Sequence, residues 1–277
     1  MPVIALTQGM GSLAQDIAEQ LAAELNLATL QHEVAERVAE KMHVSKSLIS
    51  RLRAGKAGVI ERLTADRESM ATYTAEEVLE TAAQGNVVLR GWGATCLLRP
   101  VPHVPCVRIL RPFAKRVQWL MSKLETDDIA LAEAEIQRSD HANAARMHEQ
   151  FGVNWGDPVL FDLVLNTDRL SVDTCVQQIK ALLARPEFAE TEPSRVLLQG
   201  LALSARVRAA MKAHDDTNGV DVTIESTAGT VMLKGIVLNA AERAAAEHVA
   251  AAVPGVSAVD NQLNVMARSR LFTAPKA

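Results

Sequence analysis

The sequence predicts a parallel α/β sheet covered by helices on both faces, followed by a small α+β domain. Short apolar runs alternate with segments of helical periodicity as far as Pro186, which is the pattern of a parallel sheet with crossover helices. Beyond Pro186 the order changes to helix, strand, strand, helix and strand. The length of 277 residues also exceeds the roughly 150 residues of one typical domain. We therefore expect two domains.

The strands of the first domain are predicted at apolar runs that are too short for core helices. Turn residues such as Gly9, Gly91 and Pro105 bound them. The runs do not alternate with polar residues, so they fit strands that are buried on both faces. The predicted strands span residues 3–6, 87–89, 106–110 and 160–165.

Helices are predicted between these strands, where apolar residues recur three and four positions apart. Ile17, Leu21 and Leu25 show this spacing, which places one face of a helix against a core. The predicted helical segments span residues 17–25, the polar stretch 32–81, and residues 94–98, 113–124, 129–150 and 172–183.

The second domain is predicted as an α-β-β-α-β unit. Its helices are expected at residues 197–213 and 240–253, and alternating apolar positions predict its strands. The strands span residues 220–226, 230–237 and 256–265. The resulting boundaries are residues 1–186 for the first domain, 187–196 for an acidic linker, 197–267 for the second domain and 268–277 for a basic, flexible tail.

Composition excludes several classes of protein. Hydrophobic residues make up 48% and the net charge is −4, so the chain can fold and has no general attraction to nucleic acid or anionic membranes. The three cysteines are widely spaced and predict reduced thiols in a cytoplasmic protein. We expect no signal peptide, no membrane span and no metal site, because the histidines show no ligand spacing.

A glycine turn joins the first strand to the first helix. Gly9, Gly11 and Ser12 occupy this turn, where converging N–H groups and a helix N-terminus can bind phosphate. A P-loop would supply a lysine there, but residues 13–15 are Leu-Ala-Gln. The residues alone leave two interpretations open, a tight strand-to-helix turn or a phosphate site.

Several segments of the first domain form a recognisable set. They are residues 4–25, 86–98 with Gly91-Trp92-Gly93, 107–117 with Arg108, Pro112 and Arg116, 140–152, and 155–167. Through these segments residues 1–185 resemble the cytidylate-kinase-like P-loop family, and the segment from Trp155 to Thr167 is the most specific match. The resemblance implies a nucleoside-monophosphate-kinase fold, with ATP and Mg²⁺ over the glycine turn and a nucleotide acceptor between the helices.

The turn departs from the family pattern. Family members usually carry Gly-Ser-Gly-Gly-Arg, whereas residues 11–15 read Gly-Ser-Leu-Ala-Gln, and Trp92 replaces an arginine. Phosphoryl transfer depends on positioning and charge neutralisation. We therefore predict a nucleotide-binding protein with a degenerate phosphate loop and weak or absent phosphoryl transfer. The alternative is a non-catalytic assembly or adaptor protein of kinase descent.

The resemblance leaves three candidate catalytic residues, besides Gly9, Gly11 and Ser12 for the cofactor. Arg116 and Arg146 are expected to meet phosphate, or else to be solvated or ion-paired helix residues. Asp162, on the fourth predicted strand, is a candidate magnesium ligand or base. We favour the simpler interpretation, that it bonds to backbone at a strand end. Arg90 and Arg108 are the other available cations.

The last part of the chain contains two distinctive motifs, Gly229 to Gly235 and the Pro-Gly-Val turn at residues 254–256. Through these motifs residues 198–266 resemble the BON domain. The resemblance implies phospholipid or protein binding. Lys234 and Arg243 alone do not make a membrane patch. We therefore favour a protein partner or self-association, either through the alanine-rich helix 240–253 or with those alanines against their own sheet.

Residues 38–52 also have the pattern of a helix-turn-helix. Val44 and Ser45 would form the turn, and Lys46, Ser47, Ser50 and Arg51 the recognition face for DNA. The alternative is an amphipathic helix pair that only covers the sheet. The net negative charge of the chain counts against nucleic acid as a partner.

Overall fold

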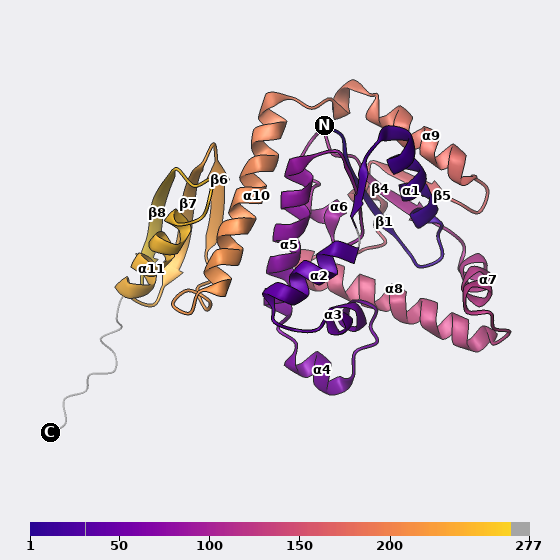
Figure 1. The fold of residues 1–277 in the computed structure, drawn as a ribbon, viewed down its shortest axis with the longest axis horizontal. Helices are drawn as coiled ribbons and strands as arrows, with labels where there is room; N and C mark the ends of the chain where they lie inside the picture. Colours follow the sequence, from indigo (N-terminus) through magenta and orange to yellow (C-terminus); the bar gives the residue numbers. More distant parts are fainter. Residues whose placement is uncertain (31, 267–277) are drawn as a thin grey trace. The chain divides into compact units, whose positions relative to one another are not determined.

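The computed structural model describes residues 1–30 and 32–266. The chain divides into two compact units, with the division after Leu198. The predicted tail, residues 268–277, lies outside the described residues. The two units are described separately below (Figure 1).

The first unit is built on a five-stranded sheet in the order β2-β3-β1-β4-β5. Every pair is parallel; Ala5 of β1, for example, lies between Leu89 of β3 and Cys106 of β4. The prediction of a parallel sheet is therefore confirmed. The strands are β1 (Val3–Gln8), β2 (Ala28–Leu30), β3 (Val87–Arg90), β4 (Cys106–Leu110) and β5 (Leu163–Asn166).

Two strands differ from the prediction. The sequence did not predict β2, because it has three residues and none of them is fully buried. The last strand begins at Leu163 rather than at residue 160, because Pro158–Leu160 forms a 3-10 turn capped by the side chain of Asp157. Short edge segments carry too little apolar pattern to be recognised.

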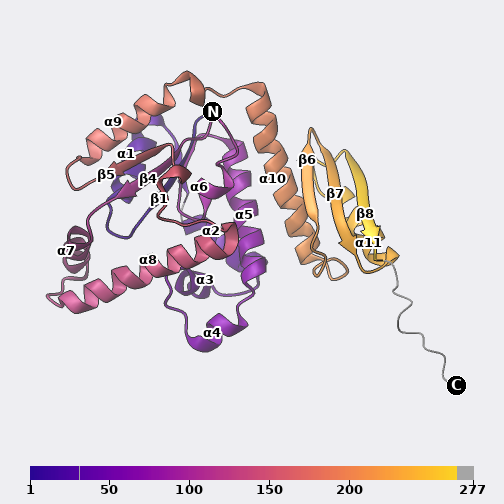
Figure 2. The same cartoon turned by 180° about the vertical axis from the view of Figure 1, so that it is seen from behind.

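Helices cover both faces of this sheet. In Figures 1 and 2, α1 and α9 lie together on one side and α5 lies on the other. Ile17 and Leu21 of α1 and Ile179 of α9 are fully buried against the sheet; burial stabilises each such side chain by about 1.5–3 kcal/mol. The helices are α1 (Ala14–Leu25), α5 (Arg67–Gln84), α6 (Ala94–Leu97), α7 (Phe113–Leu124), α8 (Ile129–Phe151) and α9 (Val172–Leu183).

The polar stretch 32–81 is not one helix. It contains α2 (His32–Lys41), α3 (Lys46–Arg53), α4 (Val59–Thr64) and most of α5. Side-chain caps explain two of the breaks: the hydroxyl of Ser45 accepts from the N–H of Leu48 at 3.2 Å, and Asp66 accepts from Ser69 at 2.9 Å. Such caps satisfy the free N–H groups of a new helix start.

The segment 187–196, predicted as an acidic linker, is packed against the first unit. Ser194 is buried and its hydroxyl lies 2.8 Å from Nδ1 of His103. Glu190 forms an ion pair with the N-terminal amino group of Met1. The 3-10 turn Pro186–Phe188 leads into the segment, which also contains the start of α10 (Glu192–Ala213). Polar contacts therefore help to hold it in place.

The second unit has the predicted α-β-β-α-β order. Strand β7 (Thr230–Val237) pairs antiparallel with β6 (Thr223–Thr227) and parallel with β8 (Ala258–Val265). Residues of α10 and of α11 (Ala240–Ala251) fill one core with the sheet. Ala246 and Ala250 of α11 are fully buried there, so these alanines face their own sheet.

Candidate functional site

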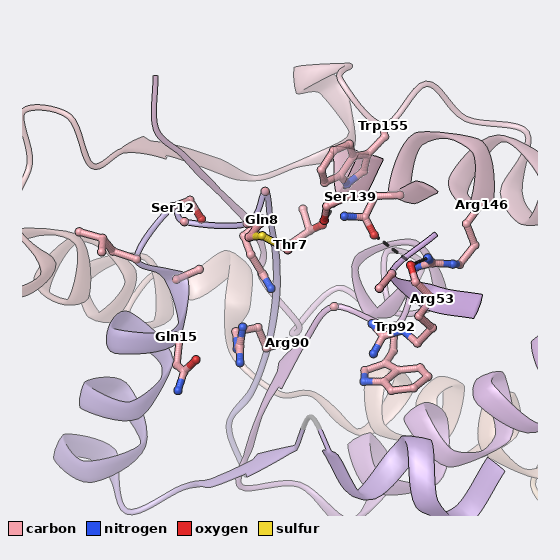
Figure 3. A pocket seen from close by; sticks show the side chains of 18 of the residues that line it. Thr7, Gln8, Ser12, Gln15, Arg53, Arg90, Trp92, Ser139, Arg146 and Trp155 are labelled. Carbon is pink, nitrogen blue, oxygen red and sulfur yellow. Dashed lines mark hydrogen bonds between the residues drawn. The ribbon is translucent and has the colours of Figure 1, made fainter. Parts of the chain in front are cut away.

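A cavity of about 450 Å³ lies where β1 and β3 end. Its walls come from the glycine turn, the first turn of α1, the end of α3, and parts of α7 and α8. Figure 3 shows these side chains around one open space. Ligands of parallel α/β sheets bind outside the carboxyl ends of the strands, so this cavity is the candidate site.

The glycine turn forms one wall with a conformation suited to an anion. Gly11 has φ +78° and Leu13 has φ 62°, and α1 begins without a side-chain cap. Its first N–H groups therefore lack an internal partner and favour negative charge. Thr167, from the most specific family-like segment, donates to the carbonyl of Ser12 at 3.0 Å and supports the turn.

Two side chains of this wall hold buried polar atoms without a partner in the described part of the chain. They are Oε1 of Gln8 and Oγ of Ser12. Buried polar atoms in folded proteins are usually hydrogen-bonded, and exceptions indicate a bound ligand, an ion or a water molecule. The orphaned atoms thus point to an occupant of the cavity.

Three arginines from separate elements form the opposite wall. Arg53 ends α3, Arg90 ends β3 and Arg146 lies on α8. Nη2 of Arg146 donates to the carbonyl of Arg53 at 2.5 Å, and the Arg53 guanidinium lies 3.2 Å from the centre of the Trp92 ring (Figure 3). Nε of Arg53 is buried and has no hydrogen-bond partner among residues 1–30 and 32–266. No described carboxylate forms a salt bridge with any of the three.

The electrostatics of this wall are unfavourable without an anion. Burial, followed by repulsion from Arg146 and Arg90, holds the pKa of the Arg53 guanidinium well below its usual value. Burial also lowers the pKa of Arg90 and Arg146, although Glu19 and Asp16 partly oppose it at Arg90. Arginine stays protonated in proteins, so a negatively charged ligand would relieve this strain.

The three tryptophans of the chain all line the cavity. Trp155 donates from Nε1 to the hydroxyl of Thr7 at 3.1 Å, and Arg108 lies 4.6 Å from its ring centre. Trp92 is buried under Arg53, whereas Trp119 on α7 is half-buried. Aromatic faces stack on nucleobases, at about 1–3 kcal/mol per base.

Arg116 lies beside the turn but is already paired. It binds Asp140 of α8 through two hydrogen bonds of 2.6 and 3.0 Å. Its Nη1 also passes so close to Gly9 that a Cβ there would lie 2.6 Å away. The ion-paired alternative therefore describes Arg116, while Arg146 and the glycine turn share the cavity.

Asp162 does not join the other candidate residues. It precedes β5 instead of lying on it, and its carboxylate accepts from the N–H of Cys106 at 2.7 Å, where β4 begins. It lines neither the large cavity nor the small one described below. This geometry is that of a residue bonded to backbone at a strand end.

The cavity offers few ligands for a magnesium ion. Asp16 and the Ser12 hydroxyl are the oxygen donors nearest the turn, and the described residues contain no cluster of three His, Cys, Asp or Glu side chains. Magnesium often binds through one or two carboxylates plus the phosphates of its substrate. These residues fit an ion that arrives with a phosphorylated ligand.

Models of two protein families match the chain. The model of the cytidylate kinase-like family matches residues 3–169. The chain belongs to the cytidylate kinase-like family. The model of the BON domain matches residues 194–267, so the second unit is a BON domain. A search of curated protein sequences found no match.

Solved structures are similar to part of this chain. An uncharacterized protein from Eubacterium ventriosum ATCC 27560 aligns with 66% of this chain and 97% of its own, at 17% identity and a TM-score of 0.53. The chain is also similar to a shikimate kinase from Bacteroides thetaiotaomicron, at 17% identity over 66% of this chain and 99% of the kinase, with a TM-score of 0.41. A shikimate kinase from Acinetobacter baumannii aligns at 14% identity over 66% of this chain and 93% of its own, with a TM-score of 0.40. The first likeness supports the fold alone.

The segment with the helix-turn-helix pattern forms the end of α2 and most of α3 in the kinase-like unit. Lys46 pairs with Glu36 at 3.2 Å and Arg51 pairs with Glu61, so two cations of the expected recognition face are partly neutralised. Ser50, at the same face, and Arg53 line the cavity. The sequence did not assign Arg53 to this site, because its approach to Trp92 depends on the fold.

Lys234 and Arg243 of the BON domain bind groups of the same domain. Lys234 pairs with Glu225 at 2.8 Å, and Arg243 donates to the carbonyls of Leu263 and Asn261 at 3.0 Å.

In the described part of the chain, no helix is both long and apolar enough to span a bilayer.

Proposed function

We propose that this protein binds a phosphorylated nucleoside in the large cavity and transfers phosphate weakly or not at all. One observation carries the proposal: among the described residues, three guanidinium groups without a salt bridge face the uncapped start of α1 and the orphaned polar atoms of Gln8 and Ser12. Charge and hydrogen-bond donors of this kind match a phosphate group. The family membership supports a nucleotide as its carrier.

Each wall of the cavity has a role in this proposal. Arg53, Arg90 and Arg146 bind the phosphate of the nucleotide, and guanidinium groups can do so through paired hydrogen bonds. Trp119 is half-buried and offers a face on which the base stacks. ATP and Mg²⁺ would bind at the turn: Asp16 and Ser12 are the residues that would hold Mg²⁺, which would supply positive charge for the phosphates.

Weak transfer follows from charges that the site lacks. The turn has no lysine, and Asp140 neutralises Arg116, the cation nearest to Gly9. Loss of one transition-state arginine slows phosphoryl transfer by about 10³–10⁵-fold. We therefore expect turnover far below the 1–100 s⁻¹ that is typical of kinases.

Calorimetric titration with CMP, CDP and ATP tests binding. We expect binding in the micromolar to millimolar range, weakened about tenfold or more in R146M, which removes a charged donor. R138M is the matched control, because Arg138 is on the same helix but pairs with Glu135 at the surface. A wild-type protein that binds none of the three at millimolar concentration contradicts the proposal, and turnover at kinase rates contradicts its second part.

A second function, assembly through the BON domain, has its own support. Ile236 and Leu238 are 64% and 66% exposed. Met266, whose N–H donates to the carbonyl of Val237 between them at 2.8 Å, is 54% exposed. Exposed apolar side chains gathered at one place often mark interaction sites. We infer association with a protein or a second copy, and expect light scattering to show less of it in the double variant I236S/L238S. An unchanged mass would contradict this.

A further inference from the structure

A second, smaller cavity lies against the same glycine turn. Its volume is about 70 Å³, and it is bounded by the end of β4 and the start of α7. A single water-sized sphere occupies about 10–15 Å³ on this measure, so the cavity holds roughly five such atoms. That is the size of one tetrahedral oxyanion, and it is too small for a nucleoside.

The charge of this cavity is positive. Arg108, Arg111 and Arg116 line it together with one carboxylate, Asp140. Asp140 is bound by Arg116 through two hydrogen bonds, and Arg108 donates to the carbonyl of Trp155. The guanidinium of Arg111 has no salt bridge in the described part of the chain, and only its Nη1 makes a contact, to the carbonyl of Gly11 at 3.3 Å.

Two residues that line this cavity each have a buried polar atom without a partner in the described part of the chain. These atoms are Nε of Arg111 and Oγ of Ser12. A water molecule can satisfy such atoms, but it does not balance three guanidinium groups against one carboxylate. An oxyanion satisfies both the hydrogen bonds and the charge.

We propose that Arg111 supplies the positive charge that the turn lacks, and that this small cavity takes the terminal phosphate of a nucleoside di- or triphosphate. The two cavities share Gly9, Ser12 and Trp155, so one ligand can place its nucleoside in the large cavity and its last phosphate beside Arg111. The inference rests on the proposed function. In this arrangement the positive charge comes from the junction of β4 and α7 instead of from the turn itself.

Titration of the full chain with CMP, CDP and pyrophosphate tests this assignment. The variant R111M keeps the length of the side chain and removes its charge, and R111K keeps the charge. The matched control is K115M, because Lys115 is an exposed neighbour on α7 outside both cavities. We expect R111M to weaken CDP and pyrophosphate about tenfold to a hundredfold, to change CMP less than twofold, and to be partly rescued in R111K.

A second variant keeps the test valid if R111M does not fold. S12A removes a buried hydroxyl that has no partner, so folding does not depend on it. We expect S12A to weaken pyrophosphate severalfold.

The remaining outcomes separate the two proposals. CDP binding that is unchanged in R111M and S12A overturns the role of Arg111 and leaves the proposed function standing. Binding of inorganic phosphate or pyrophosphate that depends on Arg111, without binding of CMP or CDP, keeps the oxyanion site and overturns the nucleotide as its source. A wild-type protein that binds none of these probes overturns both.

Discussion

Single residues around the cavity show why particular side chains are required. Gly93 has φ +73°, and a Cβ there would lie 2.8 Å from the ring of Phe151. The glycine therefore permits both a left-handed backbone and the close approach of α8. The sequence marks Gly93 as a turn residue, but the partner that requires it is 58 positions away and becomes visible only in the fold.

Comparison of G93A with G152A separates the backbone strain from the crowding against Phe151. We expect G93A to lower the free energy of unfolding by about 2–4 kcal/mol, from backbone strain and from crowding. The control is G152A, whose glycine also has a positive φ but has open space around it, so we expect only about 1 kcal/mol. Urea denaturation measures both; equal losses would contradict the role of Phe151.

His103 makes the stability of the kinase-like unit depend on pH. Burial lowers the pKa of its imidazole, while Glu190 partly opposes this effect. The unfolded chain therefore binds a proton at a higher pH than the folded chain does, and stability falls as the pH drops below about 6.5. We expect thermal melts to show a smaller fall between pH 7 and pH 5 in H103Q than in the wild type. H141Q, at an exposed histidine, is the control; an identical pH dependence in H103Q would contradict the account.

At the scale of elements, regular amphipathic segments were predictable and short or polar ones were not. Helices α7 and α9 and strand β7 have the predicted ends, because each presents a clear apolar face and is bounded by turn residues. Strand β2 and helix α4 were not predicted as separate elements. They bury no complete side-chain face, so contacts with neighbouring elements decide their conformation.

A buried polar contact joins α2 to α5. Nζ of Lys41 lies 2.6 Å from Glu76 and 2.8 Å from Glu77, and both glutamates are buried. We expect K41M to lower the free energy of unfolding by about 2–4 kcal/mol, because it leaves the buried carboxylate of Glu76 without its ion-pair partner, whereas Arg37 still pairs with Glu77 at 2.9 Å. K46M removes a half-exposed pair and should cost less than about 0.5 kcal/mol. Equal effects in denaturant titrations would contradict the importance of this contact.

At the scale of the whole molecule, the sequence predicted the order of the two folds but only part of the site. Gly9, Gly11, Ser12 and Arg146 were candidates, and the structure places them around one cavity. Arg53, like the three tryptophans, was not assigned to this site. The reason is physical: these residues are far apart in the chain, and only the parallel sheet and its crossovers bring them together.

We propose that the kinase-like unit folds without the BON domain. The buried contact of Ser194 with His103 places the cut after Leu198, where the compact units divide. We expect residues 1–198 to melt cooperatively and to keep ligand binding, and we expect light scattering to show less association than for the full chain. Aggregation or a non-cooperative melt would contradict separate folding.

The central claim is that unpaired guanidinium groups in the large cavity bind a phosphorylated nucleoside. Titration of the full chain with CDP, followed by calorimetry and by tryptophan fluorescence, tests it most directly because the three tryptophans line the cavity. R53M preserves contact with Trp92 through its sulfur and removes the charge; R51M, at the paired Arg51, is the control. The account predicts that CDP changes the fluorescence and that R53M weakens binding about tenfold or more while R51M does not. Equal affinities for wild type and R53M, or no binding to the wild type, would contradict it.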